Sequence, residues 1–311
     1  MILVTGGLGL IGLHTARCLL DMGEDAVLTQ YRVHREPDFI KDALGKRAFV
    51  EQLDVQDEAA LRDIGRRYSI AGIVHLAAPG LGALGPKDEF DTNVRGLLNV
   101  LEAARAWKVR RLLLASSIAV YAGQPAGPFK EDEPLRLSGG NPTETYKKTF
   151  EVLGQHYAQR TGLDVVVARI GGIYGPMDHN LFNPVTRFLH IALKGTPSPW
   201  PGELFEEDAN DHCYVRDAAK GIALLQTAGR LSHRVYNVGA GRATSNGEIA
   251  AEVRRYAPGA KLPLAPGRGP AYRPAPAMDI SRIRADTGYE PAFTLATAVA
   301  DYVEWLKTHP E

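Results

Sequence analysis

A glycine-rich turn directly follows the first apolar stretch and precedes the first helical pattern. It reads Thr5-Gly6-Gly7-Leu8-Gly9-Leu10-Ile11-Gly12. Gly6 allows a tight turn, Gly9 lets backbone amides approach a pyrophosphate, and Gly12 lets the helix pack closely on the strand. The helix N-terminus, with the N–H groups of Leu10 and Ile11, faces the phosphate charge. Position, spacing and flanks together predict a dinucleotide-binding site.

The end of the second predicted strand bears on which dinucleotide is bound. Dinucleotide sites usually present an acidic side chain there to the adenosine ribose, but this chain has Thr29-Gln30-Tyr31-Arg32. Arg32 and Arg35 could receive a ribose phosphate, which favours NADP, although a solvated loop arginine is nearly as common. We therefore predict NAD or NADP as the cofactor, with Gln30 and Arg32 near the ribose.

The elements that must position this site follow an alternating pattern. Short apolar, β-branched runs alternate with longer amphipathic segments, as in successive βαβ units around a parallel sheet. We predict strands near 1–5, 25–30, 47–50, 71–76, 110–115 and 164–170, and helices near 10–22, 57–68, 86–108 and 143–161. Residues 231–239 indicate a late strand that returns to the sheet, and residues 295–306 a closing helix.

The predicted fold is a Rossmann-like, doubly wound α/β sheet with a smaller C-terminal substrate-binding lobe. After Gly175 prolines interrupt the chain repeatedly, which predicts a looser second half. Residues 1–172, completed by about 211–247, are expected to form the dinucleotide-binding domain, and residues 173–210 and 248–311 the lobe.

Composition excludes several classes of protein. Lys plus Arg and Asp plus Glu both total 36, so no charge excess exists to hold nucleic acid or an anionic membrane. The N-terminus lacks a basic region, and no apolar run approaches the length of a membrane span. Cys18 and Cys213 indicate two buried thiols rather than a disulfide or a metal pair. We expect a cytoplasmic protein without a metal site.

Further motifs together resemble one family. They are Leu53-Asp54-Val55, His75-Leu76-Ala77-Ala78, Asn93-Val94-Arg95-Gly96, Ser116-Ser117-Ile118-Ala119-Val120-Tyr121, Ile173-Tyr174-Gly175-Pro176 and Tyr214-Val215-Arg216-Asp217. With the glycine pattern, they make the chain similar over essentially its whole length to the extended short-chain dehydrogenase/reductase family, in its NAD-dependent epimerase/dehydratase group. The resemblance implies that the cofactor is bordered by Asp54 and Val55 at the adenine, by Leu76, Ala77 and Ala78 under the pyrophosphate, and by Asn93 and Ile170. It gives His75 a place in the scaffold.

The resemblance also implies a catalytic tyrosine and lysine one helical turn apart, with a serine or threonine. An alcohol loses hydride to nicotinamide only if its proton is also taken. A phenol with a pKa near ~10 takes that proton only where a neighbouring ammonium and the cationic nicotinamide lower its pKa. By resemblance Ser117 holds the substrate oxygen; the alternative is a hydroxyl that merely caps a strand end.

The tyrosine is where this sequence departs from the family. Tyr146 is the tyrosine of the segment, but Phe150 rather than lysine stands four residues later. Alignment on the flanking Asn141-Pro142, Glu151 and His156-Tyr157-Ala158 instead places Thr143 at the tyrosine position and Lys147 at the lysine position, where lysine hydrogen-bonds the nicotinamide ribose.

A threonine hydroxyl is too weakly acidic to act as the base unaided. Either Thr143 only positions the substrate, or another group transfers the proton. Tyr146 lies about 60° around the helix from Thr143 and is the obvious candidate. The alternative, that Tyr146 packs beside the helix with no catalytic role, is equally open.

Two more departures concern the substrate. Gly172 stands where the nucleotide-sugar epimerases have a substrate-contacting asparagine, and Asn210 where they have an arginine that grips the diphosphate. Because bidentate arginine–phosphate contacts are strong, both losses weaken diphosphate recognition. Arg268 or Arg273, ahead of Met278-Asp279-Ile280-Ser281, could supply a phosphate contact instead, although solvated loop arginines are commoner.

Three functions remain open. The first is an NAD(P)-dependent oxidoreductase or epimerase that acts on a carbinol of a sugar, sugar acid or similar small polyol. The second is a nucleotide-sugar 4-epimerase or 4,6-dehydratase with compensating residues elsewhere. The third is a non-catalytic protein that senses the dinucleotide, against which the retention of Ser117 and Lys147 argues. The resemblance also implies a homodimer through the helices near 86–108 and 143–161, although burial inside the monomer would give the same apolar pattern.

Overall fold

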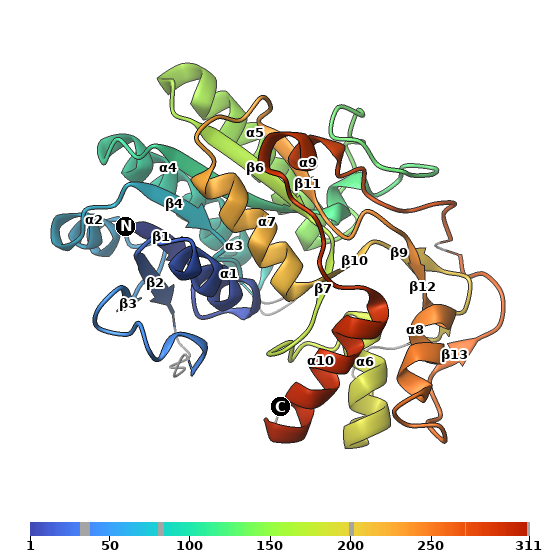
Figure 1. Ribbon diagram of the computed structural model, residues 1–311. Helices are drawn as coiled ribbons and strands as arrows, with labels where there is room; N and C mark the ends of the chain where they lie inside the picture. Colours follow the sequence, from blue (N-terminus) through green and yellow to red (C-terminus); the bar gives the residue numbers. More distant parts are fainter. Residues whose placement is uncertain (32–37, 80–83, 199–201, 271, 310–311) are drawn as a thin grey trace.

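Seven parallel strands form the central sheet, in the order β11-β6-β5-β4-β1-β2-β3 (Figure 1). The computed structural model describes residues 1–31, 38–79, 84–198, 202–270 and 272–309. The strands of this sheet are β1 (Ile2–Thr5), β2 (Ala26–Gln30), β3 (Ala48–Gln52), β4 (Gly72–His75), β5 (Arg111–Ser117), β6 (Val165–Ile170) and β11 (Val235–Val238). The doubly wound parallel sheet is thereby confirmed, including the return of the late strand to its edge.

Helices cover both faces of the sheet because alternate strand residues point to opposite faces. In β1, Ile2 and Val4 join one buried cluster and Leu3 joins the other. The first cluster includes side chains of α1 (Leu10–Asp21), α7 (Val215–Thr227) and α9 (Ser281–Thr287), and the second those of α2 (Glu58–Arg67), α4 (Gly96–Ala106) and α5 (Pro142–Thr161) (Figure 1). Short 3-10 turns follow β2 and β5, namely η1 (Asp38–Ile40) and η3 (Ile118–Tyr121).

The helix expected over 86–108 is divided in the structure. It consists of α3 (Pro86–Phe90), a π-helical turn η2 (Asp91–Arg95) and α4. Asn93 lies in the π turn, is buried, and donates through Nδ2 to the carbonyl of Glu89 at 2.8 Å. A side chain that takes a backbone carbonyl in this way competes with the regular helical ladder.

The C-terminal lobe has an aromatic core of its own. Tyr174, Phe188, Tyr214 and Tyr302 are buried in it. Its helices are α6 (Pro184–Leu189), which continues into η4 (His190–Lys194), α8 (Asn246–Arg254) and α10 (Leu295–Thr308). Its strands pair as β7 (Gly172–Tyr174) with β10 (His212–Tyr214), β8 (Leu204–Phe205) with β13 (Leu264–Ala265), and β9 (Ala209–Asn210) with β12 (Thr244–Ser245). The domain boundaries at 172 and 210 stay a prediction.

Asp211 ties the lobe to the edge of the sheet. Its buried carboxylate accepts hydrogen bonds from the backbone N–H groups of Ala240 at 2.7 Å, Gly241 at 3.0 Å and Met278 at 3.1 Å. Burial raises the pKa of Asp211 to about 6. One side chain thus joins the loop after β11 to the segment before α9.

Because three histidines are buried, we predict that the free energy of unfolding falls as the pH is lowered. Burial lowers the pKa of His14 to about 4, of His75 to about 3 and of His212 to about 4. Because an unfolded histidine titrates near ~6.5, the unfolded chain binds more protons between that pH and about 4, so the free energy of unfolding falls as the pH falls. Burial raises the pKa of Asp211, Glu131 and Asp217, so these carboxyls act in the opposite direction. Carboxyls whose pKa is lowered, among them Glu51, Glu144 and Asp286, act together with the histidines.

We expect the melting temperature to fall steadily from pH 6.5 to pH 4 in calorimetry at constant ionic strength. Replacing His14 by glutamine should flatten this decline, because one proton-binding difference is removed. A melting temperature that stays level or rises over this range would contradict the prediction.

Candidate active site

The glycine turn forms a cradle for phosphate between β1 and α1. Gly6 has a φ of +67°, and a Cβ there would lie 3.0 Å from the backbone nitrogen of Ala77. A Cβ at Gly12 would lie 2.3 Å from the carbonyl oxygen of Gly6. Gly9 provides no side-chain cap for α1, so the first helical N–H groups, those of Leu10, Ile11 and Gly12, are available to an anion. This backbone arrangement fits a dinucleotide pyrophosphate.

Thr5 connects the glycine turn to the end of β4. Its hydroxyl contacts Nδ1 of His75 at 2.7 Å and accepts from the backbone N–H groups of Leu76 at 3.2 Å and Ala77 at 3.3 Å. His75 is therefore engaged in holding the strand end, and it places Leu76, Ala77 and the following Ala78 beside the turn.

The remaining predicted cofactor residues lie along the same sheet edge. Asp54 accepts from the N–H of Gln56 at 2.9 Å, and the carbonyl of Val55 accepts from Nδ2 of Asn99 at 3.0 Å. Gln30 ends β2, and Ile170 ends β6 opposite Ser117. Arg32 and Arg35 lie outside the described residues.

Ser117 stands at the carboxyl end of β5. Its hydroxyl oxygen accepts from the N–H of Ala119 at 3.1 Å and so caps η3. Capping uses the oxygen as an acceptor only, which leaves the hydroxyl proton to be donated to a substrate oxygen. The capping role and the predicted substrate contact are therefore compatible.

Lys147 lies over aromatic rings at the carboxyl end of β4. Its Nζ is 4.8 Å from the centre of the Phe150 ring, which stacks on His75 with the ring centres 5.7 Å apart. Lys147 makes no hydrogen bond or ion pair with any residue that the structure describes. Burial lowers its pKa to about 8. Phe150 occupies the position where the lysine would stand if Tyr146 were the family tyrosine. In the structure its ring lies under Lys147, which favours the alignment that places Lys147 at the lysine position.

Thr143 and Tyr146 have different surroundings. Thr143 lies half-buried in the first turn of α5, one turn before Lys147 and on the same face of the helix. Tyr146 packs against the cluster under α2 and α4, and burial together with the charge of Glu89 raises the pKa of its phenol. A raised pKa makes a phenol harder to deprotonate, so this environment favours the packing role.

A buried polar network fixes α5 against the strands below. Arg169 of β6 pairs with Glu151 of α5 at 2.8 Å, and Ser116 of β5 donates to Glu151 at 2.5 Å. Arg169 also donates to the hydroxyl of Tyr121 at 2.8 Å, which donates in turn to Asn237 of β11 at 2.8 Å. Burial raises the pKa of Tyr121 to about 12, so this tyrosine is engaged in structure and is a poor base.

On the substrate side, Gly172 borders a polar pair that the sequence analysis did not single out. Asn183 donates through Nδ2 to the carbonyl of Gly172 at 3.0 Å and contacts Nδ1 of His212 at 3.1 Å. A Cβ at Gly172 would lie 3.3 Å from the same imidazole nitrogen. The Asn183-Pro184 dipeptide, a helix-start signal, was the sequence feature that could have drawn attention to this place.

The two candidate arginines differ in location. Arg273 donates to the carbonyl of Tyr121 at 3.2 Å and lies over the Phe129 ring at 5.0 Å, and burial lowers its pKa. It therefore reaches the turn that follows Ser117. Arg268 is exposed and pairs with Glu207 at 2.6 Å. Asn210 turns its amide oxygen back to the N–H of Asp211 at 3.0 Å.

Comparison with known proteins identifies the family. Residues 2–239 match the NAD dependent epimerase/dehydratase family. The chain belongs to that family. It is 31% identical to a dTDP-glucose 4,6-dehydratase of Streptomyces griseus over 99% of this chain and 94% of that protein. It is 32% identical to a UDP-glucuronate 4-epimerase of Thermodesulfobacterium geofontis over 77% of this chain and 75% of that protein.

A solved family structure has the same architecture. The UDP-glucose 4-epimerase of Thermus thermophilus, in complex with NAD, aligns with a TM-score of 0.77 over 99% of both chains at 26% identity. The protein is accordingly an NAD-dependent enzyme of the family, and the glycine turn described above has the backbone geometry that fits a dinucleotide pyrophosphate. In the described part of the chain, no group of three or more His, Cys, Asp or Glu could hold a metal ion, and no helix is long and apolar enough to cross a membrane.

The family's tyrosine chemistry makes Tyr146 testable. We expect Tyr146→Phe to keep turnover within about threefold of the parent, because packing without proton transfer survives the loss of one hydroxyl. The measurement is kcat in the sugar-oxidation assay described below, with the melting temperature as a check on folding. A loss of a hundredfold or more at an unchanged melting temperature would assign Tyr146 to the proton path.

Proposed function

We propose that the protein is an NAD-dependent oxidoreductase or epimerase that acts on a carbinol of a sugar, sugar acid or similar small polyol. The observation that carries this proposal is the position of Lys147 over the Phe150 ring, on the helix that packs beside the strand ending at Ser117. A protein that only senses the dinucleotide has no need of a serine in this place.

The chemistry divides between the cofactor and the chain. When bound, the nicotinamide accepts hydride from the carbinol and can return it. Ser117 donates a hydrogen bond to the substrate oxygen, and Lys147 holds the nicotinamide ribose. The Thr143 hydroxyl takes the substrate proton as it passes its own proton to the neutral amine of Lys147. A pKa of about 8 leaves a fraction of Lys147 neutral near pH 7, and the ammonium then releases its proton to solvent. Thr143 thus links the substrate oxygen to Lys147 without acting as the base itself.

Two positions, Gly172 and Asn210, favour a substrate whose binding does not depend on a firmly held diphosphate. Gly172 offers no side chain, and the Asn210 amide is turned to its own backbone. Neutral groups in place of an arginine that would bind the diphosphate favour a free sugar or sugar acid as substrate.

A nucleotide sugar is the second candidate. Arg273, which contacts the turn after Ser117, favours it, as do the nucleotide-sugar substrates in the names of the full-length relatives. Within this candidate, Ile118 and Ala119 favour epimerisation over dehydration, because expelling a hydroxyl needs a proton donor and these two residues after Ser117 carry none.

The test uses the cofactor-loaded protein with UDP, free hexoses and sugar acids. A ligand that binds only the folded state raises the melting temperature. Formation of reduced nicotinamide reports net oxidation of the sugar, and chromatographic detection of the epimer reports epimerisation, in which the hydride is returned. A shift and turnover with a free sugar or sugar acid, and no shift with UDP, supports the first candidate. A UDP shift that Arg273→Gln removes supports the second. Arg268→Gln is the matched control, because that exposed arginine lies on the same segment.

We further propose a homodimer through the helices near 86–108 and 143–161. Leu98 of α4 is 45% exposed and Val152 of α5 is 67% exposed, so two neighbouring helices present apolar side chains to solvent. Light scattering should give twice the chain mass, and Val152→Glu should shift it to the monomer. A monomeric parent protein would contradict this.

The compartment and the choice of dinucleotide complete the proposal. Cys18 and Cys213 are both free thiols, which suits the reducing cytoplasm. We propose NAD as the preferred dinucleotide, on the strength of the family match. Fluorescence titration with NADH and NADPH tests the preference, and tighter binding of NADPH would reverse it.

A further inference from the structure

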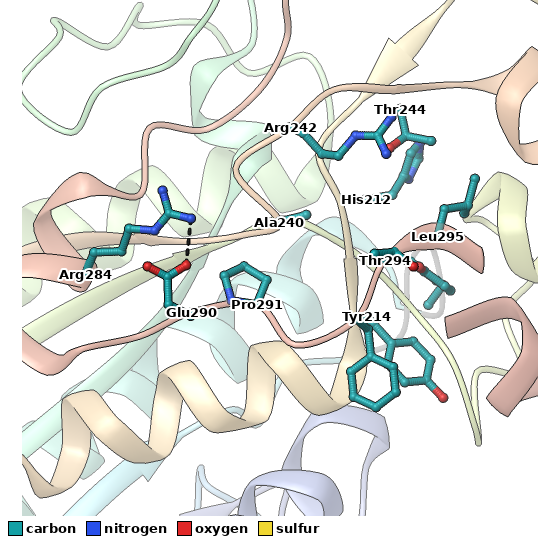
Figure 2. Close-up of a pocket in the computed structure, with 12 residues that line it drawn as sticks. His212, Tyr214, Ala240, Arg242, Thr244, Arg284, Glu290, Pro291, Thr294 and Leu295 are labelled. Atoms are coloured by element: carbon teal, nitrogen blue, oxygen red, sulfur yellow. Dashed lines mark hydrogen bonds and ion pairs between the residues drawn. The ribbon is translucent and has the colours of Figure 1, made fainter. Parts of the chain in front are cut away.

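A second hollow lies in the C-terminal lobe, away from the dinucleotide cradle. It has a volume of about 180 Å³ and opens between β10, the loop after β11 and the segment that enters α10 (Figure 2). Its polar lining comes from Tyr174, His212, Thr244, Arg242, Arg284 and Glu290. Neither Ser117, Lys147 nor Arg273 lines it.

Four lining side chains with a polar group are more than nine-tenths buried; one of them, Tyr214, pairs through its hydroxyl with Asp301, which leaves three. The exposed fractions are 3% for Tyr174, 4% for Thr244 and 7% for His212. The hydroxyls of Tyr174 and Thr244 form no hydrogen bond with any described residue. Among the described residues, neither hydroxyl oxygen is fully buried, so each keeps some solvent-accessible surface. Their small remaining exposure therefore opens on the pocket that they line.

His212 presents a donor to the same hollow. The amide oxygen of Asn183 accepts from the N–H of Val185 at 2.9 Å, which orients the amide so that its Nδ2 donates to Nδ1 of His212 at 3.1 Å. Nδ1 is thus an acceptor, and the proton of the neutral ring sits on Nε2. Nε2 has no hydrogen-bond partner among the described residues and is not sealed from solvent.

Two ion pairs and an apolar wall complete the pocket. Arg242, paired with Glu248 at 2.6 Å, extends toward Thr244 and His212 in Figure 2, and the pair of Arg284 and Glu290, at 2.8 Å, stands at the other end. Phe293 contributes the apolar side. Because buried polar groups are nearly always paired, three unpaired donors around one hollow point to an acceptor that fills it.

We propose that this pocket binds a small molecule that carries an oxyanion, a carboxylate or a phosphate group. Its oxygens accept from the Tyr174 hydroxyl, the Thr244 hydroxyl and Nε2–H of His212, and Arg242 supplies the opposite charge. The volume of about 180 Å³ has room for a compact anion. The pocket shares His212 with the polar pair beside Gly172, but none of Ser117, Lys147 and Arg273 lines it, and the proposal does not depend on the substrate of the active site.

The test titrates the full-length protein with inorganic phosphate, with glycerate and with neutral glycerol, by calorimetry. We expect saturable binding of phosphate or glycerate and none of glycerol; the tighter of the two anions identifies the group. Tyr174→Phe and Thr244→Val should each weaken binding about fivefold or more, because each removes one hydrogen bond to a charged group. Arg242→Gln should weaken it further and remove its salt dependence.

Matched controls separate the pocket from general effects. Tyr256→Phe and Arg255→Gln change exposed residues outside the pocket and should leave anion affinity unchanged. Melting temperatures without ligand check that the variants fold, and NADH titration should give the parent affinity for Tyr174→Phe.

Three results would overturn the proposal. They are the absence of saturable anion binding, anion binding that Tyr174→Phe and Arg242→Gln leave intact, and pocket variants that weaken NADH or active-site substrate as much as the anion. The last would make the hollow an extension of the active site. Loss of turnover on sugars, by contrast, bears only on the proposed function.

Discussion

Replacing Lys147 by methionine should lower kcat about a thousandfold while the protein stays folded. Lys147 holds the cofactor ribose in the proposed mechanism and is the group that exchanges the substrate proton, so both contributions are lost together. Methionine has similar length and no charge. Because Lys147 makes no ion pair with a described residue and burial already lowers its pKa to about 8, removing its charge should leave the melting temperature equal or slightly higher.

The neighbouring lysine is the matched control. Lys148 pairs with Glu144 at 2.6 Å and donates to the carbonyl of Arg136 at 2.6 Å. Lys148→Met should therefore lower the melting temperature with a smaller effect on kcat, the reverse of Lys147→Met. If Lys147→Met kept more than a tenth of the parent kcat, Lys147 would have no catalytic role. Turnover that Lys147→Met abolishes would exclude the non-catalytic hypothesis.

Breaking the buried pair under α5 should cost most of all in stability. We expect Glu151→Leu to lower the free energy of unfolding by about 3–5 kcal/mol, because it leaves the buried Arg169 guanidinium without its carboxylate. Ser116 loses its hydrogen-bond acceptor in the same variant. Urea unfolding, followed by circular dichroism, measures the change.

A double variant shows whether the loss comes from the uncompensated charge. Glu151→Leu combined with Arg169→Met removes both charges and keeps similar volumes, so it should recover a large part of the stability lost by Glu151→Leu. The recovery is incomplete, because Tyr121 also loses a hydrogen bond from Arg169. A single variant that loses under 1 kcal/mol, or a double variant no more stable than the single, would contradict this account.

The sequence alone determined the features that depend on backbone steric limits and local periodicity. The glycine pattern from Gly6 to Gly12 required a close turn against a neighbouring strand, and Gly6 does adopt a positive φ there. Alternating apolar runs determined the parallel sheet, and the element bounds agree within a few residues. Sequence spacing also predicted that Thr143 and Lys147 lie one turn apart on a single helix, and both do lie in α5; their catalytic roles stay a prediction.

Only the tertiary structure decided which distant side chains meet. Arg268 and Arg273 are five residues apart and look alike in sequence, yet only Arg273 reaches the turn after Ser117. Only the packing of Tyr146 against the core near Glu89 favours a packing role for this tyrosine, which Tyr146→Phe tests. The pocket donors Tyr174, His212 and Thr244 come from separate segments. Such meetings depend on how elements pack across the whole fold, and helix or strand periodicity carries no information about them.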